Sequence, residues 1–272
     1  MKTLTIGDIH GRNDWMMLTH GSHKNYQDWK ISVEHGTRAD SPYFKSYPFM
    51  QYDKIIFIGD YMDSFDVSNT DIKLNYLDII FFKQQLSDRV VLLLGNHDVQ
   101  YIVDGQRCSG FRPEMLFDMR ALFRHHGKLF TVAYEETDSK GHKYLWTHAG
   151  VTSGWLELLD ETIKLPANRF SNIILERNPQ TVADKVNSAW DFNLSELYTV
   201  DRDSGGWDPW AGPLWVRPDT LNKNPLPGYT QIVGHTAFKK ITKKMSVEGV
   251  GSDHYFVDCL DHVVDALALG WE

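Results

Sequence analysis

The sequence contains few cysteines, no long apolar run and fewer positive than negative charges. Cys108 and Cys259 are the only two cysteines among 272 residues, which excludes a disulfide framework and a cysteine-rich zinc site. The longest apolar runs, such as residues 90–94, have the length of a strand and fall short of the roughly 20 residues that a membrane helix needs. The start of the chain has no apolar segment typical of a secretory signal. We therefore expect a cytoplasmic protein with reduced thiols and no membrane partner.

The charge balance is acidic. Lysine and arginine total 28, aspartate and glutamate total 36, and the formal net charge is −8. A chain of this charge is not expected to bind a nucleic-acid backbone. Its 36 acidic residues and 12 histidines nevertheless supply groups that bind metals and transfer protons.

The pattern of apolar residues predicts an α/β fold. No repeat or linker divides the chain, so residues 1–272 are interpreted as one domain. A helix over 71–86, with Asp71 near its N-cap, is expected to join two parallel strands into a βαβ unit. Apolar runs that each end in a small polar cluster predict buried strands at 3–6, 54–58, 89–94, 144–146 and 231–233. Other expected elements are helices from 113, at 155–163 and at 181–197, and strands at 255–257 and 263–269.

Two stretches leave alternatives open. Residues 19–51 are polar and poorly periodic, and they form either a surface excursion or a cap or insertion near the site. Residues 201–213 combine glycines and prolines with two tryptophans. They are interpreted either as a lid that contacts substrate or as a long loop that the tryptophans anchor on the core.

The polar clusters that follow the strands are the candidate functional residues. Because ligands bind at the carboxyl ends of strands in open α/β sheets, we expect the clusters to form one site at one edge. Their sequences are G-D-I-H-G from residue 7, G-D-Y-M-D from 59, G-N-H-D from 95, H-A-G from 148 and G-H-T from 234.

In this order the clusters resemble the calcineurin-like metallophosphoesterases, and most closely the bacterial members of the phosphoprotein-phosphatase branch. The resemblance runs from residue 7 to about 236. It implies two facing mixed β-sheets flanked by helices in a single domain. It also implies a dinuclear metal-dependent phosphoesterase, in which a hydroxide held between the metals attacks phosphorus in line.

The resemblance assigns six metal ligands. Carboxylate, amide and imidazole groups together suit manganese first, with iron or zinc as alternatives, for two divalent ions. The ligands implied for the first metal are Asp8, His10 and Asp60, and those for the second are Asp60 as a bridge, Asn96, His148 and His235.

The resemblance also assigns the acid-base residues. His97 is expected to protonate the leaving oxygen, and Asp63 to hold and polarise it. Asp98 stands where protein phosphatases usually carry glutamate, and it is expected to support the metal ligands.

The second cluster departs from the phosphoprotein phosphatases at the residue after Asp63. Those enzymes carry an arginine there that grips phosphate, whereas this chain has Ser64. Arg217 resembles a Trp-x-Arg element of bacterial members and could replace it, and Arg12 is a second candidate from its position alone. The spacing of Cys108 and Arg112 excludes a cysteine-phosphatase loop, because three residues separate them instead of five.

We expect phosphomonoester hydrolysis, with proteins phosphorylated on serine or threonine as the leading substrates. The first alternative is hydrolysis of dinucleoside polyphosphates or a similar small phosphoanhydride, which stacking aromatics would favour. A binding module that lost turnover is a weaker alternative, because every expected ligand position is filled.

Overall fold

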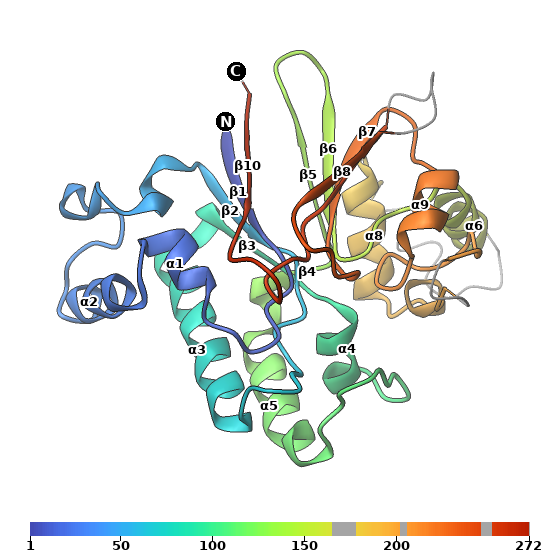
Figure 1. The fold of residues 1–272 in the computed structure, drawn as a ribbon. Helices are drawn as coiled ribbons and strands as arrows, with labels where there is room; N and C mark the ends of the chain where they lie inside the picture. The colour runs from blue at the N-terminus through green and yellow to red at the C-terminus, as the bar shows by residue number, and fades with distance from the viewer. Residues whose placement is uncertain (165–177, 202–205, 246–251, 272) are drawn as a thin grey trace. The chain divides into compact units, whose positions relative to one another are not determined.

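The chain folds into two mixed β-sheets flanked by helices, which confirms the α/β prediction (Figure 1). The computed structural model describes residues 1–164, 178–201, 206–245 and 252–271. One sheet has the strand order β10-β1-β2-β3-β4 and the other β5-β6-β7-β9-β8. The chain forms two compact units, a first unit of residues 1–130, 237–241 and 257–272, and a second unit of residues 131–236 and 242–256.

The described elements have the following bounds. The strands are β1 Lys2–Ile6, β2 Lys54–Phe57, β3 Val90–Leu93, β4 Phe130–Thr131, β5 Ala133–Thr137, β6 Lys143–Thr147, β7 Tyr229–Val233, β8 Thr242–Met245, β9 Asp253–Phe256 and β10 Leu267–Gly270. The α-helices are α1 Trp15–His20, α2 His23–Glu34, α3 Asn69–Leu86, α4 Asn96–Ile102, α5 Leu116–His126, α6 Ser153–Lys164, α8 Val182–Asp191 and α9 Pro218–Lys223. Short 3₁₀ helices are η1 Pro42–Phe44, η2 Pro48–Gln51, η3 Ser87–Arg89, η4 Pro113–Met115, η5 Gly127–Leu129 and η6 Ser195–Tyr198.

The predicted βαβ unit forms the centre of the first unit. Strands β1, β2 and β3 are parallel neighbours, and Ile55, Ile56 and Phe57 of β2 are fully buried, as expected for a parallel strand covered on both faces. Helix α3 begins two residues earlier than predicted, because Ser68 is the N-cap and its hydroxyl accepts a hydrogen bond from the amide of Asp71.

Residues 19–51 form most of a small helical layer in the first unit. Helix α2 buries Tyr26 and Trp29. The Trp29 ring lies 5.5 Å from that of Phe82 on α3, and the Tyr26 hydroxyl donates to the carbonyl oxygen of Asp78 on the same helix. The stretch is therefore packed against α3, while a function as a cap stays a prediction.

The second unit contains the other parallel strands that carry predicted site residues. Strands β6, β7 and β9 are parallel, with β5 and β8 antiparallel at the edges. The helix predicted over 181–197 is shorter, since α8 ends at Asp191 and Asn193 turns the backbone with a φ of 52° before η6. Thr181 caps α8 by accepting from the amide of Asp184.

The last two strands lie in different sheets. The strand predicted at 255–257 is β9 of the second unit. The strand predicted at 263–269 is β10 of the first unit. The prediction of a strand from residue 263 was wrong by four residues, because β10 begins at Leu267. It pairs antiparallel with β1, so the two ends of the described chain run side by side (Figure 1).

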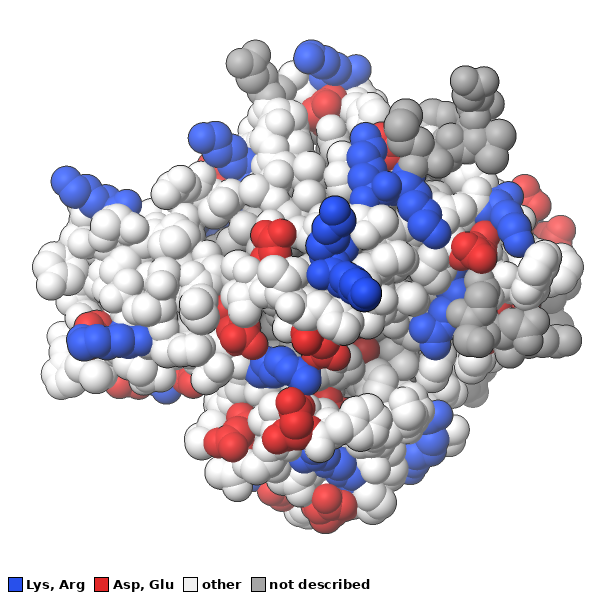
Figure 2. Space-filling model, in the orientation of Figure 1, with Lys and Arg blue, Asp and Glu red and all other residues white. Residues whose placement is uncertain are grey.

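The surface carries charges of both signs. On the face that Figure 2 shows, lysine and arginine are interspersed with aspartate and glutamate among the described residues. None of the described helices combines the length and the apolar composition needed to cross a membrane.

Candidate functional site

The predicted site residues follow strands of both sheets, which corrects the expectation of a single edge. Asp8, Asp60 and Asn96 come after the adjacent parallel strands β1, β2 and β3 of the first unit. His148 and His235 come after the adjacent parallel strands β6 and β7 of the second unit. Each unit thus collects its own set at the carboxyl ends of its parallel strands, as expected for such sheets.

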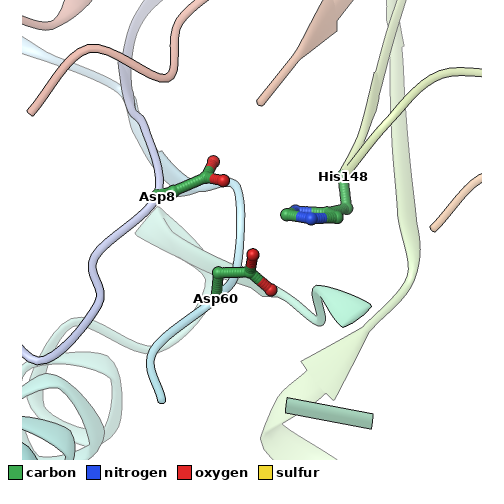
Figure 3. A group of neighbouring side chains, drawn as sticks. All are labelled: Asp8, Asp60 and His148. Atoms are coloured by element: carbon green, nitrogen blue, oxygen red, sulfur yellow. The ribbon is translucent and has the colours of Figure 1, made fainter. Parts of the chain in front are cut away.

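Two buried carboxylates dominate the set of the first unit. The side chains of Asp8 and Asp60 are 3% and 2% exposed, and a carboxylate oxygen of one lies within 4.8 Å of one of the other. Figure 3 shows both side chains, together with His148, which follows β6 of the second unit. Two buried carboxylates this close repel each other, and a bound cation would offset that repulsion. Their oxygen chemistry therefore fits divalent metal ions.

His10 is oriented so that its Nε2 can bind a metal. Its Nδ1 lies 2.9 Å from the carbonyl oxygen of Asp63 and 3.2 Å from that of Met62. Both groups only accept hydrogen bonds, so Nδ1 is the donor and Nε2 is the ring atom that can face a metal. That Nε2 lies 3.9 Å from Oδ2 of Asp60.

Several site residues have a left-handed backbone. The φ angles of His10, Asp60, Asp63 and His235 are 45°, 51°, 58° and 66°. Non-glycine residues seldom adopt this conformation, and each costs of order 1–3 kcal/mol. Such strain persists where surrounding contacts hold the backbone, which is common where side chains must be aimed at a ligand.

Asp98 holds the backbone of the Asp60 turn. Its carboxylate is fully buried and accepts from four amides: Oδ2 from Asp60 and Gly95, both at 2.8 Å, and Oδ1 from Tyr61 at 2.8 Å and Met62 at 3.3 Å. Burial and then the charge of Asp60 raise the pKa of Asp98, while these backbone amides lower it. The side chain thus holds both the turn after β2 and the turn after β3, while its role in supporting metal ligands stays a prediction.

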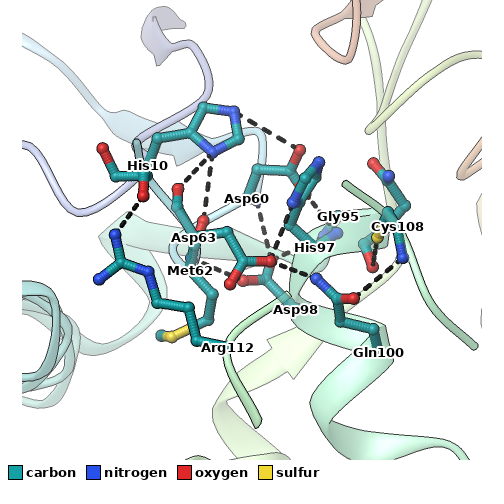
Figure 4. A network of polar contacts seen from close by, with 12 residues as sticks. His10, Asp60, Met62, Asp63, Gly95, His97, Asp98, Gln100, Cys108 and Arg112 are labelled. Carbon is teal, nitrogen blue, oxygen red and sulfur yellow. Dashed lines mark hydrogen bonds and ion pairs between the residues drawn. The ribbon is translucent and has the colours of Figure 1, made fainter. Parts of the chain in front are cut away.

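His97 and Asp63, for which acid-base roles were predicted, are in direct contact (Figure 4). Nδ1 of His97 donates to Oδ2 of Asp63 at 3.0 Å. Burial lowers the pKa of His97, but the charges of Asp60 and Asp63 and the hydrogen bond to Asp63 outweigh it and raise the pKa to about 9. The imidazole is therefore favoured in its protonated form, which a general acid requires.

Two residues that sequence reasoning missed also hold Asp63. Gln100 donates to Oδ2 of Asp63 and Tyr101 donates to Oδ1. Both lie on α4 at three and four residues after His97, which places them on the same helix face. That spacing was the available signal in the sequence.

Cys108 and Arg112 have structural contacts that agree with excluding a cysteine nucleophile. The amide of Cys108 donates to Oε1 of Gln100. Burial, then the charges of Asp60 and Asp63, raises the pKa of the Cys108 thiol, whereas a nucleophilic thiol needs a lowered pKa. Arg112 donates to the carbonyl oxygens of Ser64 and Val67.

Arg12 lies at a cavity beside His10 and His97. Its guanidinium pairs with Asp261 at 2.7 Å and with Asp66 at 3.1 Å. A hydrogen bond from Ser64 and the charge of Arg12 lower the pKa of Asp66. The structure thus brings Arg12 to the same cavity as His97 and Asp63, with two carboxylates already paired to its charge.

The second unit brings His148, His235 and Arg217 together. The rings of His148, which is fully buried, and His235 lie 5.2 Å apart. Nη1 of Arg217 donates to Oγ1 of Thr236 at 3.1 Å and to the carbonyl oxygen of His235 at 3.4 Å. The guanidinium therefore lies beside the turn that carries a predicted ligand.

The 201–213 stretch exposes both of its tryptophans, although residues 202–205 lie outside the described part. Trp207 and Trp210 are 69% and 54% exposed, and the ammonium of Lys223 lies 3.6 Å from the centre of the Trp207 ring. This exposure disagrees with the alternative in which both tryptophans anchor the loop on the core.

Comparisons with known proteins identify the family of this chain and solved structures with a similar fold. The family model of the calcineurin-like phosphoesterases matches residues 1–237, which include every predicted ligand. A cold-active protein-tyrosine phosphatase of a psychrophilic Shewanella species has a similar structure, with a TM-score of 0.52 and 17% identity over 98% of this chain and 75% of that chain. A mutant of a cold-active protein tyrosine phosphatase gives a TM-score of 0.51, 17% identity and the same coverage. No curated protein sequence matches.

Proposed function

This chain belongs to the calcineurin-like phosphoesterase family, and we propose that it is a metal-dependent phosphatase that hydrolyses phosphomonoesters on proteins, with phosphoserine and phosphothreonine as the leading substrates. The observation that carries the proposal is the His97–Asp63 pair, which lies beside buried carboxylates of the same unit. A pair of this kind serves reactions whose leaving oxygen needs a proton.

The proposed ligands of two divalent ions are those predicted from sequence. We assign Asp8, His10 and Asp60 to the first ion, and Asp60, Asn96, His148 and His235 to the second. The buried, mutually repelling carboxylates and the orientation of His10, whose Nδ1 faces backbone carbonyls and leaves Nε2 for a ligand, support this assignment. Bound ions would supply Lewis acidity and an activated water. Manganese is the first choice, with iron or zinc as alternatives.

The side chains of the first unit then supply the proton. In the overall reaction the oxygen of water bonds to phosphorus, the ester P–O bond breaks, and the alcohol leaves with a proton. His97 donates that proton from Nε2, because the proton on Nδ1 is already hydrogen-bonded to Asp63. Gln100 and Tyr101 hold Asp63 in place. We assign binding of the substrate phosphate to the guanidinium of Arg217. Arg12 is the second candidate, because its charge is already paired with two aspartates.

One observation favours the alternative substrate class. Trp207 and Trp210 are exposed, and stacking of a nucleobase on such rings would suit a dinucleoside polyphosphate. The substrate panel below therefore includes one.

Metal removal tests the proposal. We expect the protein without metal to be inactive, and activity to return when manganese, iron, zinc or magnesium is restored singly. Each form is assayed on an aryl phosphate, on phosphoserine, phosphothreonine and phosphotyrosine peptides, and on diadenosine tetraphosphate; phosphotyrosine is included because the Shewanella neighbour is named a protein-tyrosine phosphatase. No turnover on any substrate, together with no bound metal by elemental analysis, would refute the proposal.

Replacing His97 by alanine separates the acid role from metal binding. We expect His97→Ala to lower kcat on phosphoserine peptides by about 100-fold or more. The loss on p-nitrophenyl phosphate should be much smaller, because its leaving group needs little protonation. Steady-state kinetics with both substrates measures the difference.

The matched control is His125→Ala, which removes an exposed histidine from α5. It should leave both activities unchanged. Equal losses on the two substrates for His97→Ala would contradict the general-acid role.

A further inference from the structure

A buried aspartate of the second unit, Asp201, connects two segments that lie apart in the chain. The residue is 6% exposed. Its Oδ1 accepts hydrogen bonds from the amides of Trp207 at 2.9 Å and Asp208 at 3.2 Å, and its Oδ2 accepts one from the amide of Arg217 at 3.0 Å. A buried carboxylate needs such donors to offset its lost hydration. Asp201 therefore fixes the backbone of Arg217 relative to the Trp207 turn.

The Arg217 side chain is held at both of its ends. Arg217 is the N-cap of α9, with an extended backbone at φ −96° and ψ 157°, and its amide donates to Asp201. At the other end, Nη1 donates to Oγ1 of Thr236 and to the carbonyl oxygen of His235. An arginine side chain has several rotatable bonds, so holding its backbone and its tip lowers the entropy that it loses when it binds a ligand.

The turn before Trp207 packs closely against Arg217. Gly206 has a φ of 87°, and a Cβ added there would lie 2.7 Å from Cβ of Arg217 and 2.9 Å from Oδ2 of Asp201. It would also lie 2.5 Å from Oγ1 of Thr220. Both the backbone conformation and the space therefore call for glycine at this position. The close approach keeps the turn, the carboxylate and the arginine in one arrangement.

The segment that ends at Arg217 also contacts the turns of both predicted ligands in this unit. The amide that follows His148 donates to the carbonyl oxygen of Pro213 at 2.8 Å. The ring of Trp215 lies 5.8 Å from the ring of His235, at an interplanar angle of 82°. The segment therefore ties the position of Arg217 to both imidazoles.

We propose that Asp201 is a positioning residue, which holds the backbone of Arg217 so that the guanidinium meets the substrate phosphate beside the His235 turn. The inference rests on the proposed function, in which Arg217 binds that phosphate. Asp201 contacts the backbone of the arginine, so it acts on the substrate through the guanidinium. A displacement of about 1 Å in a substrate-binding group costs about 100-fold in rate. The loss of this backbone contact should therefore be visible in kinetics.

The test is a double-mutant cycle of Asp201→Asn and Arg217→Ala, using the metal-loaded protein and its best substrate from the panel above. An asparagine has one acceptor oxygen, so its NH₂ group would face at least one of the three amides. We expect Asp201→Asn to lower kcat/KM by about tenfold. The further loss should be less than about twofold when residue 217 is already alanine. The same loss in both backgrounds, or no loss in either, would overturn the inference.

Asp138→Asn is the matched control in the same unit. Asp138 also accepts from backbone amides, those of Lys140 at 2.9 Å and His142 at 2.8 Å. Its turn precedes β6, whereas His148 follows that strand. The control should leave kcat/KM unchanged. Equal losses for Asp138→Asn and Asp201→Asn would show that any weakened turn lowers the rate, which contradicts a specific effect on Arg217.

Binding of inorganic phosphate separates this inference from the proposed function. Phosphate is titrated by calorimetry into the metal-loaded wild type, both single variants and the double variant. Asp201→Asn should raise the dissociation constant in the wild-type background and leave it nearly unchanged in the Arg217→Ala background. Wild-type phosphate binding by Arg217→Ala would overturn the inference, while turnover by the wild type would still support the proposed function. If the wild type hydrolyses no substrate, the proposed function fails, and the phosphate titrations still decide whether Asp201 acts through Arg217.

Discussion

Gly95→Ala is expected to remove metal binding and to lower kcat/KM by about 100-fold or more. A Cβ at residue 95 would lie 2.0 Å from Oδ1 of Asp60 and 2.7 Å from its backbone nitrogen. Neither group can yield easily, because Asp98 and the amide of His97 fix the Asp60 turn. The backbone of Gly95 is extended, with φ −105° and ψ 176°, so alanine adopts it without strain. The whole effect should therefore come from displacement of Asp60.

Metal content by elemental analysis, thermal unfolding and kinetics together check this expectation. Gly127→Ala is the control, since Gly127 is helical and a Cβ there would meet nothing within 4 Å. The control should keep its metal and its rate. A Gly95→Ala protein with normal metal content and normal kinetics would show that Asp60 is not a ligand.

Asp98→Asn is expected to cost about 2–4 kcal/mol of stability. An asparagine has one acceptor oxygen, so two of the four amides that donate to the carboxylate would face an NH₂ group. Those amides belong to buried residues, and a buried donor that loses its acceptor is costly. Urea unfolding of the metal-free protein, monitored by tryptophan fluorescence, measures the change. Activity should fall as well, because the turn that aims Asp60 loses its support.

Asp104→Asn provides the comparison for an aspartate whose charge is exposed. Its side chain is 87% exposed and pairs with Arg120 at 2.7 Å, and such surface pairs contribute about 1 kcal/mol or less. Its unfolding midpoint should stay close to that of the wild type. Similar midpoints for Asp98→Asn and Asp104→Asn would show that the four amides do not depend on the buried carboxylate.

The strand ends and their order could be predicted from the sequence because the signals are local. An apolar run followed by glycine and a polar residue identifies the ends of β1, β2, β3, β6 and β7 within a few residues. The βαβ connection also followed from local periodicity. The pair formed by His97 and Asp63 came with the resemblance and is present in the structure; the roles of both residues stay proposals.

The remaining features depend on contacts between residues far apart in the chain. Gln100 and Tyr101 lie 37 and 38 residues from Asp63; their spacing from His97 indicates a shared helix face, but the contact with Asp63 depends on the fold. The start of β10 was misplaced because Val263 and Val264 have the composition of a strand, yet they are 39% and 40% exposed. The pairing of β10 with β1, at the other end of the chain, decides where this strand begins.

The path of the chain determines where it can be shortened. The family match ends at residue 237, but the first unit also includes residues 257–272. The carbonyl oxygen of Val257 would lie 2.2 Å from a Cβ at residue 7, so this returning segment presses against the glycine that precedes Asp8. Asp261, the partner of Arg12, and β10, the neighbour of β1, also lie in it. A fragment cut at residue 237 would keep all six proposed ligands and lose the backbone that supports one of them, so the boundary of the sequence family is not a boundary of the folded unit.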